Sequence, residues 1–424
     1  MNQLRYGSRG PRVEFLQLAL NRGGVGPIAV DGIFGADTAE GVRRFQRQHG
    51  IPSDGTVTRR THAALHPYYT GYVSHSVQRG ETLPSIARRY HTSLRSLEAA
   101  NHVTDAMHLR VGTILTVPLS FPVVPTGIQW SSQVLQSVTE GLDARYPFLR
   151  RRIIGRSVMG KPLYAMAMGS GRRTVLYSGT HHGNEWITTP LLLHFAEQLA
   201  AAAIREGTIY DKDAQSLLHN TRFLIVPCVN PDGMDVVTGY LEEGPVYHRV
   251  RSIGAAYPQI PFPQGWKANI RGVDLNLQYP AAWEQARQIK FAQGYTTPAP
   301  RDYVGTQPLT QPEARAMVRL TELSSPDRIL AYHTQGEVIY PQFLDFDPPD
   351  SMPIAWQLAA ASGYDVEPTP PDSAAAGYKD WFIQTYNRPG YTIEAGKGVS
   401  PLPLEDFDLI YAQNLPIMVL TATL

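Results

Sequence analysis

The sequence predicts a multidomain protein: a small helical bundle, then a βααβ module, then a larger domain in which apolar strands alternate with helices. The chain has 424 residues and is 43% hydrophobic, more than one typical core needs, which predicts two or three domains. Apolar residues recur at helical spacing near the amino terminus, whereas short apolar runs mark strands further along. Spaced prolines in residues 119–127 predict a semi-rigid linker before the larger domain.

The first module, residues 1–70, is expected to be helical, with glycine-rich turns between its helices. The apolar residues at helical spacing are Val13, Leu16, Leu20, Val42 and Phe45. Periodicity alone predicts only a helical module. The string Asp-Gly-Ile-Phe-Gly at residues 31–35 is more specific, and with it residues 4–65 resemble the peptidoglycan-binding domain 1 family.

The second module, residues 71–118, consists of two β-rich segments that flank two helical stretches, which predicts a βααβ order. The string Gly80-Glu81-Thr82-Leu83, with Asn101 further on, resembles the LysM family. That resemblance implies binding of glycans that contain N-acetylglucosamine, chiefly peptidoglycan or chitin, and it places these residues at the edges of the sugar groove. The alternative is that both modules serve only for folding or docking.

The larger domain, residues 128–424, carries a pattern typical of a metal site. His182 and Glu185 stand three residues apart after the apolar strand 174–178, and His333 follows a later strand at residues 328–330. A zinc ion used for hydrolysis takes three protein ligands and keeps a fourth position open. A short His/Glu pair is a weak signal by itself, because most such residues lie on surfaces or cap helices. His181 is out of register with the pair, so it is expected to have a supporting or structural role.

Six pieces of this domain occur in the order of one family. They are His182-Gly183-Asn184-Glu185-Trp186, Val229-Asn230-Pro231-Asp232-Gly233, Gly272-Val273-Asp274-Leu275-Asn276, His333, Asp380-Trp381 and Tyr391-Thr392-Ile393-Glu394. With them the domain resembles the zinc carboxypeptidase family. The resemblance implies an α/β fold with a mixed central sheet and one Zn²⁺ on His182, Glu185 and His333. It also implies that Glu394, expected at the head of a flexible loop, activates the zinc-bound water.

Two departures from the family pattern concern the substrate. The family's motif continues from Asn276 with an arginine that grips a terminal carboxylate, but here the residue is Leu277, which removes strict dependence on a free carboxyl terminus. Asn276 itself is retained as a substrate-binding residue. The family's oxyanion arginine is replaced by Lys267, and Arg271, Arg249 or Arg251 are candidates to share its role.

Three further positions are assigned to substrate binding. Asp372 stands where counting places the family's mobile tyrosine, and Tyr378 is a candidate to compensate for it by reaching in from nearby. By resemblance, Lys379 lies at the floor of the pocket on the leaving side of the scissile bond, where an ammonium selects an acidic group such as that of diaminopimelate. The alternative for Lys379 is a solvated loop residue.

Together these features predict a zinc-dependent hydrolase of peptidoglycan stem peptides. A closer resemblance to the bacterial γ-D-glutamyl-meso-diaminopimelate peptidases implies cleavage of the bond between the γ-carboxyl of D-Glu and meso-diaminopimelate, in association with sporulation. One alternative is a carboxypeptidase that trims the stem peptide. Another is a wall-binding protein whose peptidase domain has lost activity.

The composition of the chain excludes few classes of function. Residues 1–118 hold fourteen arginines, no lysine and eight acidic residues, a balance that suits an anionic polymer such as cell wall. No nucleic-acid motif and no stretch of about 18 apolar residues for a membrane span is evident, and Cys228 stands alone. The amino terminus carries no signal pattern, so we expect a cytoplasmic enzyme, wall-associated if it is released or exported. The oligomeric state is left open.

Overall fold

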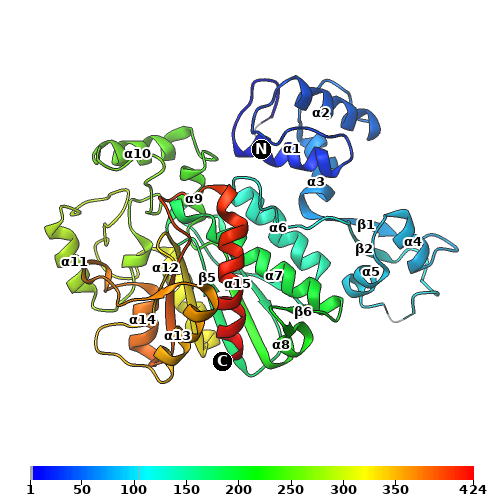
Figure 1. The fold of residues 1–424 in the computed structure, drawn as a ribbon. Coiled ribbons are helices and arrows are strands. Elements are labelled where there is room, and N and C mark those ends of the chain that lie inside the picture. The colour runs from blue at the N-terminus through cyan, green and yellow to red at the C-terminus, as the bar shows by residue number, and fades with distance from the viewer. Residues whose placement is uncertain (1–2, 104) are drawn as a thin grey trace. The chain divides into compact units, whose positions relative to one another are not determined.

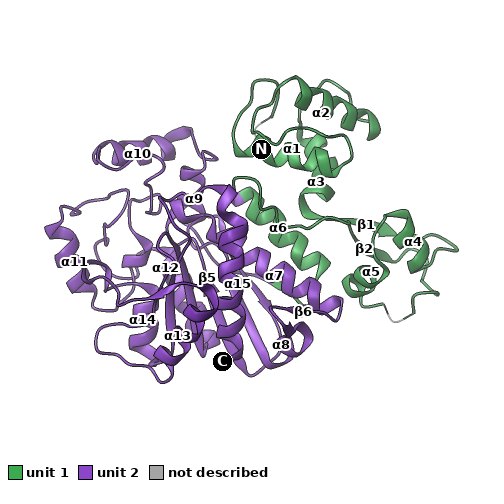
Figure 2. Cartoon of the chain, viewed as in Figure 1, with its two compact units in different colours: residues 1–129, 133–150 green, residues 130–132, 151–424 purple. Residues whose placement is uncertain are grey.

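The structure, a computed structural model, describes residues 3–103 and 105–424, so residues 1–2 of the first module and residue 104 of the second lie outside it. The chain divides into two compact units (Figure 2). Unit 1 comprises residues 1–129 and 133–150, and unit 2 comprises residues 130–132 and 151–424. The four domain boundaries expected from the sequence stay a prediction.

Unit 1 begins with the predicted helical module (Figure 1). Its helices are α1 (Pro11–Arg22), α2 (Ala36–Gln48) and α3 (Arg59–Thr70). The apolar residues at helical spacing in α1 and α2 are fully buried, so the pattern is confirmed. The side chain of buried Gln17 in α1 accepts hydrogen bonds from the backbone N–H groups of Asp31 and Gly32, at 3.0 and 2.9 Å. This contact explains the Asp-Gly turn of the motif, in which Gly32 adopts a φ of 69°.

The βααβ order of the second module is confirmed. Its elements are β1 (Tyr72–Ser76), α4 (Leu83–Arg89), α5 (Leu94–Asn101) and β2 (Ile114–Pro118), with β1 antiparallel to β2. The Asn101 side chain accepts from Thr116 N–H at 2.8 Å and donates to Thr116 C=O at 2.7 Å, so it attaches α5 to β2. Its predicted place beside a glycan groove stays a prediction. Unit 1 ends with most of α6 (Ser132–Arg145).

Unit 2 is built on an eight-stranded mixed sheet, as predicted, with the order β11-β10-β12-β9-β5-β8-β4-β3. Its strands are β3 (Arg150–Arg156), β4 (Pro162–Met168), β5 (Arg173–Ser178), β8 (Thr221–Val226), β9 (Arg328–Thr334), β10 (Val338–Tyr340), β11 (Asp365–Val366) and β12 (Gly390–Ala395). The four central strands β12, β9, β5 and β8 are parallel, whereas β4 and β10 run antiparallel to their inner neighbours. Parallel strands bring their carboxyl ends to one edge of a sheet, and ligand sites form there.

Strand β12 is longer than the sequence suggested. Glu394 was expected in a flexible loop, but it lies within β12, between Val338 of β10 and His333 of β9. Pairing on both sides extends the strand past the short apolar run that sequence patterns detect. Glu394 is therefore held by the sheet and not by a loop.

Helices cover both faces of the sheet. The elements outside the sheet are α7 (Thr188–Ile204), β6 (Thr208–Ile209), β7 (Lys212–Asp213), α8 (Ala214–Asn220), α9 (Pro231–Val237), α10 (Gly244–Ala255), α11 (Trp283–Ala292), α12 (Pro312–Ser324), α13 (Ser351–Ser362), α14 (Tyr378–Tyr386), α15 (Phe407–Thr423) and the short turns η1 (Gly183–Glu185), η2 (Leu275–Leu277), η3 (Pro371–Ser373) and η4 (Leu404–Asp406).

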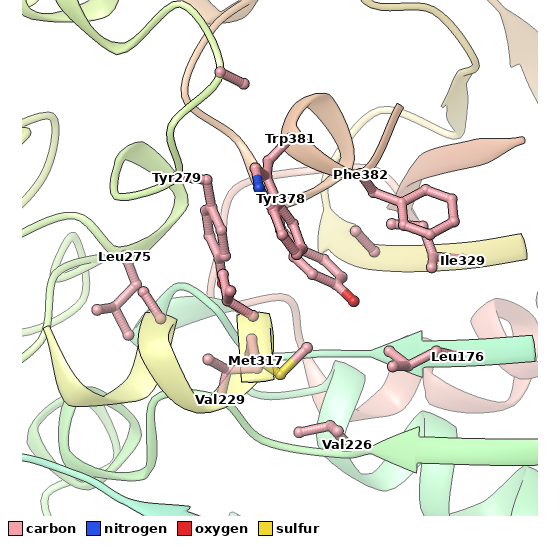
Figure 3. Packing of buried hydrophobic residues seen from close by; sticks show 14 of the residues in the cluster. Leu176, Val226, Val229, Leu275, Tyr279, Met317, Ile329, Tyr378, Trp381 and Phe382 are labelled. Atoms are coloured by element: carbon pink, nitrogen blue, oxygen red, sulfur yellow. The ribbon is translucent and has the colours of Figure 1, made fainter. Parts of the chain in front are cut away.

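Neighbouring residues of β5 show the two faces. Tyr177 packs on Phe195 of α7 and donates a hydrogen bond to the C=O of Met418 in α15 at 2.6 Å. Leu176 belongs to the opposite cluster, which includes Met317 of α12 and Phe382 of α14 (Figure 3). Because side chains alternate along a strand, this pattern gives a helix–sheet–helix arrangement.

Contrary to the sequence-based expectation, the segment Gly183–Ile204 is long and apolar enough to cross a membrane by length and composition. Of its most apolar window, 78% is buried inside the protein. Core helices of soluble proteins pass the same criterion, so this one segment is weak evidence for a membrane span.

Candidate metal centre

The three predicted metal ligands come together at the carboxyl edge of the central strands. His182 and Glu185 follow β5 through the turn η1, and His333 lies near the end of the adjacent parallel strand β9. All three side chains are buried, and one ligand atom from each lies within 4.8 Å of the others. The fold thus joins residues that are far apart in the sequence.

The geometry of this cluster fits a shared cation. His182 Nδ1 lies 2.9 Å from Glu185 Oε1, and His333 Nδ1 lies 2.8 Å from Glu185 Oε2. The two Nδ1 atoms lie 3.2 Å from each other. At such distances the lone pairs of two imidazole nitrogens and a carboxylate can all point at one metal ion. This donor set suits zinc.

Asp274 fixes the orientation of the first ligand. His182 Nε2 lies 3.1 Å from Asp274 Oδ1, so a proton on Nε2 donated to this carboxylate leaves the Nδ1 lone pair available for a metal. Asp274 stands in a motif of the sequence, but no role was predicted for it. Because a carboxylate commonly orients a histidine that binds a metal, an acidic residue in that motif was a signal that could have predicted this role.

The loops of the site are held by close backbone packing. A Cβ on Gly183 would lie 2.6 Å from the backbone of Gly233, so only glycine allows η1 to approach α9 this closely. The Asn230 side chain donates to the C=O groups of His181, Lys267 and Ala268 at 3.1 to 3.2 Å. One amide thereby holds the ligand-bearing loop against the loop that carries Lys267.

Lys267 lies beside the cluster, as the sequence predicted for the oxyanion position. Its Nζ donates to Glu185 Oε1 at 2.9 Å, and its side chain is mostly buried. Burial lowers the pKa of Lys267, but Glu185 and Glu394 raise it more, so the pKa is raised overall and the ammonium keeps its charge. Arg271, the other cation assigned to catalysis, is exposed, and its side chain makes no recorded contact with the cluster.

Glu394 is half-buried and stands beside His333 in the sheet. Burial and then repulsion from Glu185 raise the pKa of Glu394 to about 8, while Lys267 and His182 oppose this shift. The pKa of Glu185 is well below its ordinary value, because His182, Lys267 and His333 outweigh its burial. In this cluster the protein therefore favours the protonated form of Glu394 and the ionised form of Glu185.

A pocket of about 120 Å³ opens at Glu394, which is one of its lining residues. Asn276 and Lys379, two predicted substrate-binding residues, line it with Asp380 and Thr369. The Lys379 side chain is 3% exposed, so the alternative of a solvated lysine is wrong. Its ammonium lies 2.8 Å from Asp380 Oδ1 and also donates to Thr369 and to the C=O of Gln342. The pocket thus presents an ion pair and not a lone cation.

Two predicted substrate-binding residues are placed elsewhere. The hydroxyl of Tyr378 shares a buried hydrogen bond of 2.7 Å with Thr321, and Figure 3 shows its ring beside those of Tyr279 and Trp381. The expectation that it reaches into the site is wrong, because the start of α14 turns it into the core. Asp372 is exposed on η3 and accepts a hydrogen bond from Gln293 at 3.1 Å, so it contacts no residue of the cluster.

His181 has the supporting position that its register suggested. It is fully buried, its Nε2 lies 3.1 Å from the hydroxyl of Tyr279, and its ring stacks on those of His333 and Tyr378. Burial holds its pKa well below the usual value, so the ring is neutral. It supports the ligand His333 from behind.

Comparisons with known proteins agree with this geometry. The zinc carboxypeptidase family model matches residues 135–403, a peptidoglycan binding domain model matches residues 9–65, and the LysM domain model matches residues 75–118. Gamma-D-glutamyl-L-diamino acid endopeptidase 1 of Lysinibacillus sphaericus is 42% identical over 279 residues, which cover 65% of this chain and 68% of that protein.

Two further similarities extend the comparison. The uncharacterized protein YqgT of Bacillus subtilis is 37% identical over 283 residues, 66% of this chain and 73% of that protein. Among solved structures, bovine thrombin-activatable fibrinolysis inhibitor superposes with a TM-score of 0.56 at 18% identity, over 70% of this chain and 97% of the other. At that identity the likeness shows the fold alone.

Proposed function

The chain belongs to the zinc carboxypeptidase family, and we propose that it is a zinc-dependent peptidoglycan hydrolase that cleaves the γ-D-glutamyl–diamino acid bond of stem peptides. The observation that carries this proposal is the 42% identity over 279 residues to an enzyme whose name states that activity. The peptidoglycan-binding and LysM modules in the same chain support a cell-wall substrate. A role in sporulation and the location in the cell stay predictions.

The residues of the metal centre suit amide hydrolysis. A zinc ion held by His182, Glu185 and His333 would supply Lewis-acid polarisation of the scissile carbonyl. A cation held there would favour the ionised form of Glu394. The Glu394 carboxylate is then the general base that takes a proton from the attacking water and passes it to the leaving amine. The Lys267 ammonium faces the negative charge that develops on the carbonyl oxygen.

The absence of the carboxylate-binding arginine supports an endopeptidase over a carboxypeptidase. Leu277 is 7% exposed and packs in an apolar cluster with Trp283, Val304 and Ala376. An apolar side chain in this position offers no bidentate partner to a terminal carboxylate. The substrate can therefore continue beyond the pocket.

The charges of the pocket favour a diamino acid on the leaving side. Lys379 and Asp380 form an ion pair among the residues that line the pocket next to Glu394. The side chain of meso-diaminopimelate ends in both an ammonium and a carboxylate. A lone cation would repel the ammonium of this end group, whereas the net-neutral pair of Lys379 and Asp380 does not.

Mass spectrometry of reaction products tests the proposal. L-Ala-γ-D-Glu-meso-diaminopimelate and its D-Ala-extended form would be incubated with zinc-loaded protein, with Glu394→Gln, and with Glu405→Gln, a matched change at an exposed position. We expect release of L-Ala-D-Glu from both substrates by the wild type and by Glu405→Gln, and none by Glu394→Gln.

Two other results would contradict the proposal. Release of D-Ala alone would make the protein a carboxypeptidase. No product from protein that holds stoichiometric zinc would indicate another substrate or a wall-binding role. The zinc content, measured by atomic absorption, separates an inactive metal-bound protein from one that never took up the metal.

A further inference from the structure

Arg301 lies in a loop that both of its neighbours attach to the metal centre. The C=O of Pro300 accepts hydrogen bonds from the N–H groups of Lys267 and Ala268, each at 2.8 Å. The N–H of Asp302 donates to Asp274 Oδ2 at 3.1 Å. The backbone of Arg301 is therefore fixed between the loop of the oxyanion lysine and the carboxylate that orients His182. Sequence reasoning missed this residue, because no motif marks its loop.

The guanidinium of Arg301 is anchored on one edge only. Its Nε donates to Asp302 Oδ2 at 2.5 Å, and the other oxygen of this buried carboxylate lies 2.7 Å from Lys290 Nζ. Among the residues that the structure describes, no protein partner is recorded for either Nη atom, and the side chain is 43% exposed. One carboxylate thus balances two cations, and the outer edge of the guanidinium remains open to a ligand.

The open edge of an anchored guanidinium suits a carboxylate. Arginine presents parallel N–H groups in a planar fork that matches two carboxylate oxygens. The positive charge of Arg301 lies close enough to Lys267 and Asp274 to interact with both. An anion bound by Arg301 would therefore lie beside the metal centre and not on a remote surface.

The position relative to the pocket indicates which part of the substrate carries this anion. Neither Arg301 nor Lys267 lines the pocket that holds Lys379, Asp380 and Asn276. If the leaving diamino acid occupies that pocket, the acyl side of the scissile bond is left facing the loops of Lys267 and Arg301. In a γ-linked D-glutamyl residue the acyl side carries a free α-carboxylate, a short methylene chain away from the scissile carbonyl.

We propose that Arg301 binds the α-carboxylate of the γ-linked D-glutamyl residue and so distinguishes a γ-linkage from an ordinary peptide bond. This inference rests on the proposed function, because it takes the γ-D-glutamyl bond as the bond that is cleaved. Arg301 acts as a specificity-determining residue, whereas Lys267 serves the reacting carbonyl. An α-linked residue at this position has its α-carboxyl group in the scissile bond and so has no free α-carboxylate to offer.

A pair of substrates that differ in one group tests the assignment. The first is L-Ala-γ-D-Glu-meso-diaminopimelate, and the second carries an α-carboxamide in place of the α-carboxylate of D-Glu. Steady-state kcat/KM is measured on both for the wild-type holoenzyme, Arg301→Ala, Arg301→Lys and Arg287→Ala. Arg287 is an exposed arginine of α11 and serves as the matched control.

The wild type should prefer the carboxylate substrate by about 10- to 100-fold, as expected for a charge-assisted hydrogen-bonded pair. Arg301→Ala should lose most of this preference, because its kcat/KM should fall much more on the carboxylate substrate than on the carboxamide. Arg301→Lys keeps the charge without the fork and should retain part of the preference. Arg287→Ala should behave like the wild type.

Each of the following outcomes would count against the assignment. Equal cleavage of both substrates by the wild type, or an equal loss on both in Arg301→Ala, would show that Arg301 does not read the α-carboxylate. Cleavage of neither substrate by zinc-loaded wild type would instead overturn the proposed function, and this inference with it. If Arg301→Ala does not fold, as judged by circular dichroism, a full wild-type preference in Arg301→Lys would count against bidentate binding.

Discussion

Glu313 lies in the first turn of α12 with no exposed surface, and it belongs to a buried group of charges outside the metal centre. Its Oε1 accepts a hydrogen bond from Val158 N–H at 2.9 Å. Burial, with a further contribution from Asp232, raises the pKa of Glu313 from 4.5 to about 7. We predict that Glu313→Gln makes unit 2 more stable at alkaline pH.

The sign and the size of this change in stability follow from proton linkage. Between pH 4.5 and about 7 the folded protein holds a proton that the unfolded chain has released, so the free energy of unfolding falls as the pH rises through this window. A shift of this size corresponds to roughly 3 kcal/mol. Glutamine keeps the acceptor for Val158 and does not ionise. The variant should therefore match the wild type near pH 4.5 and exceed it by up to roughly 3 kcal/mol at pH 8.

Tryptophan fluorescence during urea unfolding measures this difference for unit 2 alone. All six tryptophans lie in that unit: Trp130, Trp186, Trp266, Trp283, Trp356 and Trp381. Titrations at pH 5, 6, 7 and 8 would be compared for wild type, Glu313→Gln and Glu322→Gln, a matched change at an exposed position of the same helix. A stability difference between Glu313→Gln and wild type that stays constant over this range would refute the reasoning.

Three other changes probe the site. Asp274→Asn should weaken zinc binding by about 10- to 100-fold in competition with a chelator, and an unchanged affinity would contradict its role in orienting His182. Lys267→Met should lower kcat by about 10²- to 10³-fold with little effect on KM, and Lys267→Arg should restore most of the activity. A change in KM alone would argue against oxyanion stabilisation. Lys379→Met should lower kcat/KM about 10-fold for a diaminopimelate substrate but not for its alanine analogue, and urea unfolding checks that unpaired Asp380 has not destabilised the protein.

Sequence motifs predicted the metal ligands, because His182, Glu185 and His333 follow apolar strands whose ends meet at one edge of the sheet. They could not predict side-chain direction. Tyr378 stands two residues before the Asp380-Trp381 motif, but the start of α14 turns its hydroxyl toward Thr321, a contact set by tertiary packing. Sequence patterns also ended the last strand before Glu394, because pairing with β9 and β10 is a non-local effect.

The sequence also could not predict which residues of loops without motifs lie at the site. Arg301 lies beside the metal centre because its neighbours Pro300 and Asp302 bond to Lys267 and Asp274, which are distant from it in the sequence. Arg271 is adjacent to a motif but is exposed. Counting from the motif therefore located Lys267 correctly, whereas adjacency to the motif was a poor guide for Arg271.

The edge strand β3 affects how copies of the protein meet when many of them bind to one polymer. An open sheet edge exposes unpaired backbone groups, and a second copy can add its own strand there. The exposed residues of β3 include Arg152, Ile153 and Arg156, so arginines flank the apolar Ile153. Two such strands laid side by side would bring like charges together, which disfavours pairing. Copies bound along one polymer should therefore resist pairing through β3.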